Sequence, residues 1–134
     1  MVWQSHAHNG AFSTANRTWL PVPAEHLTHA VDAQHGVEGS VLEYYRAMLG
    51  FRHAHPALAK GSIELLPVQG DVLAFIRQHG DERLVCVFNM AEAATAYRLP
   101  AGMQPLDAGC PGVLAAASNG EINLEPFGAY IGVL

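Results

Sequence analysis

From Gly61 to Leu134 the chain is a succession of short β-rich runs separated by turn residues. The punctuation includes Pro111-Gly112 and Asn119-Gly120, which favour tight turns. Regular short strands with such punctuation are typical of an antiparallel β-sandwich, so the fold class is predicted to be mainly β. The runs are IELLPV, DVLAFIRQ, ERLVCVFNM, ATAYRLP, QPLDA, GEINLEP and AYIGVL.

The middle of this region reads as a β-hairpin. Gln78-His79-Gly80-Asp81 has the composition of a hairpin turn. The run LVCVF that follows is apolar on both faces, which predicts a central strand. Cys86 in this run is most simply a buried thiol, and with Cys110 it makes no disulfide framework.

A helix is predicted over residues 41–54. Ser40 and Glu43 have the spacing of a capping box, in which the Ser40 hydroxyl accepts the Glu43 amide and the Glu43 carboxylate reaches back to Ser40. The helix should stop before Pro56, because the residue before a proline avoids the helical conformation. Apolar residues recur at helical spacing at Val41, Leu42, Tyr45, Met48, Leu49 and Phe51.

Residues 1–39 show neither helical nor alternating periodicity, and we expect one long irregular loop. A structureless loop of this length inside a compact domain is uncommon and usually functional. Its aromatic residues Trp3, Phe12 and Trp19 argue against disorder. They could stack on sugar rings, although packing against a neighbouring domain is the commoner role for each.

The composition restricts the partners. Seven Lys and Arg against 12 Asp and Glu give a net charge of −5, and no basic cluster is present, which argues against nucleic acid. The apolar runs are far shorter than the roughly 20 residues that span a bilayer, so no membrane partner is expected. No signal-peptide pattern is visible at the N-terminus, and a reducing, cytoplasmic location fits the cysteine usage.

The histidines are the first candidate ligands, since His6-Ala7-His8 and His53-Ala54-His55 resemble metal-binding pairs. A zinc site needs three or four ligands, and no cysteine joins these pairs. Surface and loop histidines are the better interpretation, with no metal and no cofactor. Glu25 and Asp32 could be offered as the two carboxyl groups of a glycosidase, but nothing in their context supports the pair. No nucleophile motif is present, so residue chemistry alone predicts no catalytic residue.

Residues 1–4 read MVWQ, residues 9–13 read NGAFS, residues 19–22 read WLPV and residues 40–46 read SVLEYYR. In this order the stretches resemble motifs of the α-glucosidase branch of glycoside hydrolase family 13, which includes oligo-1,6-glucosidases, maltases and trehalose synthases. Each motif is modest, but their order and spacing are specific and cover nearly the whole chain. Residues 1–4, 9–13 and 19–22 resemble its PMxW, NAGFS and WLPV motifs, Gln34 matches NVxxQ, residues 40–52 resemble SLLxxYRxLIxLR, and residues 55–58 resemble xPAL. DVLAFIRQHGDERLVCVFNM resembles the start of the family's C-terminal domain, and LEPFGAYIGVL resembles its closing LxPxxxxVxxL.

The resemblance implies that residues 1–57 are the loop and last helix of a truncated (β/α)8 barrel and that residues 58–134 are an α-amylase-type C-terminal β-sandwich. In the family this loop lies at the catalytic face, so Trp3 and Phe12 are expected to bind substrate as walls of the site entrance. The implied parent enzyme is a retaining glycosidase acting on α-glucosides such as maltose and isomalto-oligosaccharides, and the implied partner is its missing barrel domain.

Two departures from the family qualify this expectation. The family's nucleophile Asp, acid/base Glu and third Asp lie upstream of every residue here, so this chain alone is predicted to be inactive. Asn9-Gly10-Ala11-Phe12 replaces the usual Asn-Ala-Gly-Phe, and we expect the exchange to shift the local turn.

Two alternative functions stay open. A stand-alone carbohydrate-binding module needs an exposed aromatic platform, whereas most aromatic residues of the β part fit core positions. A non-catalytic interaction or scaffold protein would self-associate through the helix face, and we expect a homo-oligomer because no barrel buries that face. The aromatic residues are Phe75, Phe88, Tyr97, Phe127 and Tyr130, and the helix face carries Val41, Tyr45, Met48 and Leu49.

Overall fold

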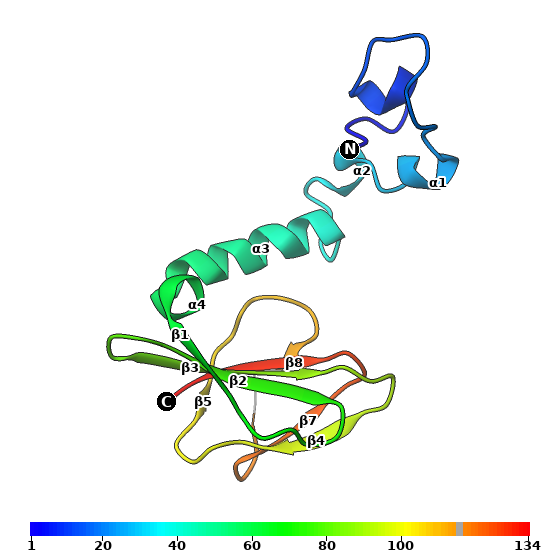
Figure 1. Cartoon of the computed structure of the whole chain (residues 1–134). Coiled ribbons are helices and arrows are strands. Elements are labelled where there is room, and N and C mark those ends of the chain that lie inside the picture. Colours follow the sequence, from blue (N-terminus) through cyan, green and yellow to red (C-terminus); the bar gives the residue numbers. More distant parts are fainter. Residues whose placement is uncertain (115–116) are drawn as a thin grey trace. The chain divides into compact units, whose positions relative to one another are not determined.

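The computed structural model describes residues 1–114 and 117–134 (Figure 1). Its helices are η1 (His8–Ala11), α1 (Ala24–Leu27), α2 (Val31–Gln34), α3 (Val41–Ala54) and α4 (Pro56–Lys60). Its strands are β1 (Ser62–Leu65), β2 (Val72–His79), β3 (Glu82–Asn89), β4 (Thr95–Arg98), β5 (Gln104–Pro105), β6 (Val113–Leu114), β7 (Glu121–Leu124) and β8 (Ala129–Val133). None of the helices in these described ranges has the length and apolar character that crossing a bilayer requires.

The chain divides into two compact units, Met1–Arg46 and Ala47–Leu134, and the division falls inside α3. The first unit is not the single irregular loop that the sequence predicts, because it contains η1, α1 and α2. Each of these helices is only 4 residues long, which is too short for an apolar repeat to appear.

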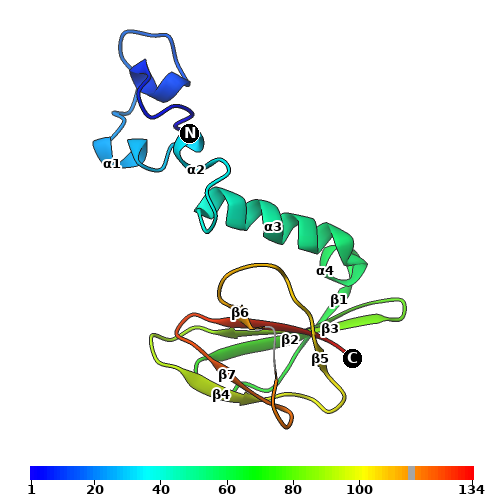
Figure 2. The same ribbon diagram turned by 180° about the vertical axis from the view of Figure 1, so that it is seen from behind.

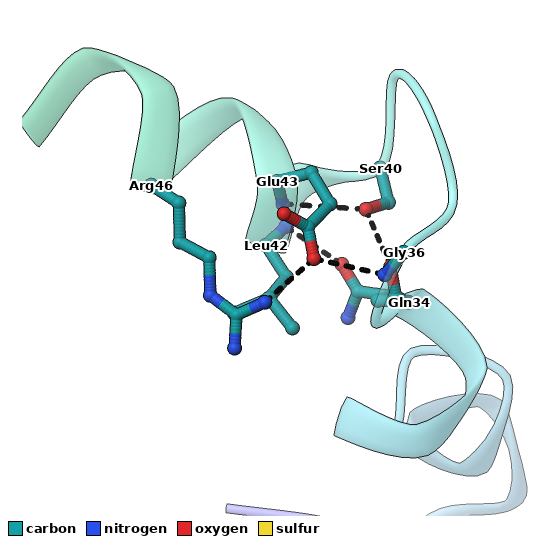
Figure 3. A network of polar contacts seen from close by, with 6 residues as sticks. All are labelled: Gln34, Gly36, Ser40, Leu42, Glu43 and Arg46. Atoms are coloured by element: carbon teal, nitrogen blue, oxygen red, sulfur yellow. Dashed lines mark hydrogen bonds and ion pairs between the residues drawn. The ribbon is translucent and has the colours of Figure 1, made fainter. Parts of the chain in front are cut away.

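Helix α3 begins and ends where the sequence predicts, at Val41 and Ala54. Its start is held by a network of side chains (Figure 3). The Glu43 amide donates to the Ser40 hydroxyl at 3.3 Å, which confirms half of the capping box. The other half is wrong, because the Glu43 carboxylate accepts from the Gly36 amide at 2.9 Å instead of from Ser40. The Gln34 side chain accepts from the Leu42 amide at 3.0 Å and so satisfies a further donor at the helix start.

Pro56 ends α3 as predicted, but it also begins α4, which the sequence analysis missed. A proline fits the first position of a helix because its fixed φ is helical and the amide it lacks has no helical partner there. The Ala57 side chain of this short helix is fully buried.

The second unit contains a β-sandwich, as predicted. The larger sheet has the strand order β1-β2-β3-β8-β5, all antiparallel, with β6 pairing in parallel to β8. The smaller sheet is the antiparallel pair β4-β7. Strand β3 lies between β2 and β8, which confirms the prediction of a central strand. Figures 1 and 2 show the smaller sheet packed against one face of the larger.

The core lies between the two sheets. Alternate residues of β2 and β3 point into it, and Ile122, Leu124 and Tyr97 of the smaller sheet meet them. Tyr130 of β8 is fully buried in the same cluster. The remaining buried members are Val72, Ala74, Ile76, Val85, Val87 and Leu99.

The opposite face of the larger sheet is only partly covered. On this side, away from β4 and β7, the segment between β5 and β6 forms an arch (Figure 2). Its first residue extends the β5–β8 pairing, since the Leu106 amide donates to the Ile131 carbonyl at 2.9 Å. Nearer β1, apolar side chains stay open to solvent, with exposed fractions of 58% for Ile63 and 69% for Leu65. The register places Phe75 opposite Leu65 and Phe88 opposite Leu73, so all five share one face. We call Ile63, Leu65, Leu73, Phe75 and Phe88 the outer apolar patch.

Candidate functional site

The first unit folds around a turn at Asn9, Gly10 and Ala11, whose φ values are 51°, 62° and 60°. All three residues therefore lie in the left-handed region, which is unfavourable for a residue with a Cβ. Gly10 is buried against Val2, and its carbonyl accepts from the Trp3 amide at 2.8 Å. The exchanged Asn-Gly-Ala-Phe order thus puts alanine at a left-handed position.

Side chains from this turn hold the loop that follows. His8 Nε2 lies 3.0 Å from the Ala15 carbonyl, and the Asn9 side-chain amide donates to the same carbonyl at 2.6 Å. The Ser13 hydroxyl accepts from the Ala15 amide at 3.2 Å. These contacts fix the His8 ring as part of the loop, in keeping with a loop histidine.

Two open hollows lie on this unit. The first is lined by residues that carry amide, hydroxyl and guanidinium groups as well as by apolar residues. Its lining is Ala7, Asn9, Gly10, Asn16, Arg17, Thr18, Pro21, Val22 and Leu27. The sequence analysis did not single out Arg17 as a lining residue of this hollow. Its isolation could have drawn attention to it, since Arg17 is the only Arg or Lys before Arg46.

The predicted substrate-binding residues Trp3 and Phe12 are both half-exposed, at 50% and 46%. Phe12 lines the second hollow together with His8 and Ser13. Trp3 is not among the residues that line either hollow. The structure therefore gives Phe12 a place beside a hollow and leaves Trp3 on a neighbouring surface of the same unit.

The carboxylates of this unit make local contacts. Both Asp32 carboxylate oxygens accept from the Ser5 amide at 3.0 Å, and the Asp32 amide donates to the Trp3 carbonyl at 3.0 Å. Asp32 thereby holds the N-terminal segment against α2. The hydrogen bond from the Gly36 amide lowers the pKa of Glu43, and Arg46, 2.7 Å away, adds to this effect.

No group of three or more His, Cys, Asp or Glu residues that could hold a metal ion occurs within residues 1–114 and 117–134. Of the two histidine pairs, His53 lies in the last turn of α3 and His55 is the residue between α3 and α4. The His55 ring packs against Phe51 at a centroid distance of 4.4 Å. His55 also contacts Glu82 of β3.

In the second unit, Tyr97 and Tyr130 are core residues, as the sequence predicts. Phe75 and Phe88 stack at a centroid distance of 5.9 Å in the outer apolar patch, and Phe127 is exposed. Cys86 is a buried thiol, as predicted, and burial raises its pKa to about 11. Burial also raises the pKa of Cys110.

Comparison with known families and relatives gives a consistent match. The family described as "Maltogenic Amylase, C-terminal domain" matches residues 63–131. A "Probable alpha-glucosidase" of Rhizobium meliloti (strain 1021) is 41% identical over 131 residues, which are 97% of this chain and 23% of that protein. A "Probable oligo-1,6-glucosidase 2" of Bacillus subtilis (strain 168) is 29% identical over 101 residues, covering 75% of this chain and 18% of the relative.

Solved structures give the same picture. The α-glucosyl transfer enzyme XgtA aligns with a TM-score of 0.87 and 32% identity over 99% of this chain and 24% of its own. The trehalulose synthase MutB from Pseudomonas mesoacidophila MX-45 aligns with a TM-score of 0.81 and 26% identity over 98% of this chain and 24% of its own. The chain thus spans about a quarter of the length of these relatives.

Proposed function

Because the chain belongs to glycoside hydrolase family 13, as the C-terminal part of an enzyme of the α-glucosidase and trehalose synthase type, we propose that it serves a larger retaining α-glucosidase of the oligo-1,6-glucosidase type that acts on α-glucosides. The enzyme cleaves terminal α-glucosyl bonds of maltose or isomalto-oligosaccharides through a covalent glycosyl intermediate. The catalytic carboxyl groups belong to its barrel domain, and this chain is non-catalytic. The β-sandwich supports the barrel structurally.

The outer apolar patch carries this proposal. Ile63, Leu65 and Leu73 are 58%, 69% and 42% exposed, and together with two stacked phenylalanines they form a contiguous apolar surface. An exposed surface of this kind marks an interaction site. The chain spans about a quarter of the length of its relatives. The partner that we propose for the outer apolar patch is the barrel domain of the larger enzyme.

Trp3 and Phe12 act in this proposal as walls of the substrate entrance. Active sites of (β/α)8 barrels gather at the loops that follow the strands, and aromatic rings there stack on sugar faces. Half-exposed rings on a unit whose backbone is tied together by Gly10 and Asp32 suit this role. The cytoplasmic location stays a prediction from the cysteine usage.

The coding DNA upstream of the Met1 codon tests the proposal. We expect an open frame of several hundred codons that encodes alternating strands and helices, with an Asp and a Glu at strand ends. A stop codon followed by a ribosome-binding site directly before Met1 contradicts it, and so does α-glucoside hydrolysis by the pure chain at an enzyme-like rate.

The protein encoded by that longer frame then tests the patch. Leu65→Ser should lower its melting temperature, because the substitution places a hydroxyl in the barrel interface. Val68→Ser, at an exposed residue just beyond β1, is the matched control and should leave the melting temperature nearly unchanged. Equal effects of the two substitutions contradict the assignment of the patch.

Carbohydrate binding by the sandwich itself is a second candidate, favoured by the Phe75–Phe88 stack and by the exposed Phe127. Titration of the chain with maltose separates the two functions. We expect calorimetric titration of the chain alone to show no saturable binding of maltose. Saturable binding that Phe127→Ala abolishes favours the binding module.

A further inference from the structure

Helix α4 is too short to be stable through its own hydrogen bonds. It has 5 residues, whereas isolated helices need about 12–15 residues to be even marginally stable in water. The residue before it, His55, makes no side-chain capping bond to the helix. Contacts from elsewhere in the fold must therefore hold α4.

At the N-terminal end of α4 the holding group is the Glu82 carboxylate. Its Oε2 accepts from the Ala57 amide at 2.7 Å, and its Oε1 lies 2.7 Å from Nδ1 of His55. Glu82 begins β3 and lies 25 residues beyond Ala57, so it acts as a cap supplied by a distant strand. A negative charge at this end also complements the helix dipole.

At the C-terminal end of α4 the holding group is Arg77 of β2. Its Nη2 donates to the Gly61 carbonyl at 2.8 Å, just after the helix ends. Gly61 approaches β2 so closely that a Cβ there would lie 2.7 Å from the Gln78 carbonyl oxygen. A positive charge at this end again complements the dipole.

The same region holds the end of α3. The Phe51 and His55 rings pack with centroids 4.4 Å apart, and Arg52 Nη1 donates to the Leu58 carbonyl at 2.6 Å. The end of α3 and the helix α4 are thus joined to each other, and α4 is joined at both ends to one hairpin.

We propose that the β2–β3 hairpin acts as a clamp on α4, in which Glu82 and Arg77 bind the two ends of the helix through hydrogen bonds. The clamp thereby fixes the orientation of the Ala47–Ala54 part of α3 relative to the sandwich. The two charged side chains come from one face of one hairpin, because Arg77 pairs with Leu84 and Glu82 lies two residues from Leu84. This inference rests on the second unit alone and does not depend on the proposed enzymatic function.

Amide hydrogen exchange of the unmodified chain gives the first test. Ala57 is the second residue of α4, where an amide has no partner within its own helix. We expect its exchange to be slow, like that of the Val85 and Val87 amides in β3. Exchange at the rate of a solvent-exposed amide overturns the proposal.

Substitution of Glu82 gives the second test. In Glu82→Ala the Ala57 amide should exchange about tenfold faster while the Val85 and Val87 amides keep their protection, which shows that the sandwich is still folded. Glu121→Gln, at the exposed first residue of β7, is the control and should leave the Ala57 amide unchanged. An unchanged Ala57 rate in Glu82→Ala overturns the clamp.

The direction of α3 can be measured by electron spin resonance between labels at Ala47→Cys and Ala96→Cys. Both positions are exposed, and the native thiols Cys86 and Cys110 are buried. We expect one narrow distance distribution in the parent chain and a clearly broader one when Glu82→Ala and Arg77→Met are combined. Equal widths overturn the proposal.

Discussion

A Cβ atom built on Gly10 would lie 2.8 Å from Cγ1 of Val2. Gly10 also has a φ of 62°, so a side chain there meets both backbone strain and a steric clash. We expect Gly10→Ala to destabilise the first unit by about 2–4 kcal/mol. Trp fluorescence can follow its unfolding selectively, because both Trp residues, Trp3 and Trp19, belong to this unit.

Gly36 provides the matched control for Gly10→Ala. Its φ is 75°, but nothing lies within 4 Å of a Cβ built there. Gly36→Ala should therefore show the backbone strain alone, about 1 kcal/mol. If the two substitutions lower the free energy of unfolding equally, the Val2 side chain must move away from the new Cβ without cost.

The neighbouring Ala11 is in the opposite situation, since it has a side chain at a φ of 60°. Relief of left-handed strain favours Ala11→Gly by about 1–2 kcal/mol, and the greater freedom of glycine in the unfolded chain offsets about 0.4–1 kcal/mol of it. We expect a net stabilisation of about 0.5–1 kcal/mol, measured by the same fluorescence transition. A destabilised variant would contradict the left-handed assignment.

Tyr130 is fully buried, and within the described residues its hydroxyl makes no hydrogen bond. A buried polar group without a partner lowers stability, so its removal should be harmless. Tyr130→Phe is expected to leave the free energy of unfolding unchanged or to raise it by up to about 1 kcal/mol in urea titrations. Leu124→Ala, at an equally buried position in the same core, is the contrast and should cost about 2–5 kcal/mol.

The clamp predicts a specific acid sensitivity. Partial burial acts to raise the pKa of Glu82, but the hydrogen bonds from the Ala57 amide and His55 and the charges of His55 and His79 outweigh it, so the pKa is lowered. The stabilising contribution of Glu82 is therefore complete above its ordinary pKa of 4.5 and is lost as the pH falls through the lowered native value.

Glu82→Gln removes this titration. Unfolding in urea at several pH values should show the parent chain losing stability below about pH 4.5 more steeply than Glu82→Gln. The variant Glu121→Gln should follow the parent. Parallel curves for the parent and Glu82→Gln would mean that the carboxylate contributes nothing across this range.

The sequence predicts most strands of the second unit because their signals are local, whereas it misses α4 and the two-residue strand β6. The alternation of Val85 and Val87 with apolar neighbours and the Gly80 turn suffice to place β3 inside a sheet. The Ser40 cap likewise predicts the first residue of α3, because the hydroxyl and the Glu43 amide are three residues apart.

The features that sequence reasoning missed depend on distant partners. Glu43 contacts Gly36 because the chain folds back at a left-handed glycine, and α4 exists because Glu82 caps it from another strand. Similarly, Leu73 and Phe88 carry the same apolar signal as core residues, and only the tertiary structure reveals that their face is open.

The position of β8 has a consequence for synthesis of the protein. Every other strand of the larger sheet precedes β8 in the chain, yet β8 lies between β3 and β5 and is also the partner of β6. While the ribosome is still translating, β1, β2 and β3 can already pair as neighbours, but β5 and β6 have nothing to pair with. The nascent chain therefore exposes an open β3 edge until Ala129–Val133 leaves the exit tunnel, and an unpaired edge of this kind can pair with a strand of another chain.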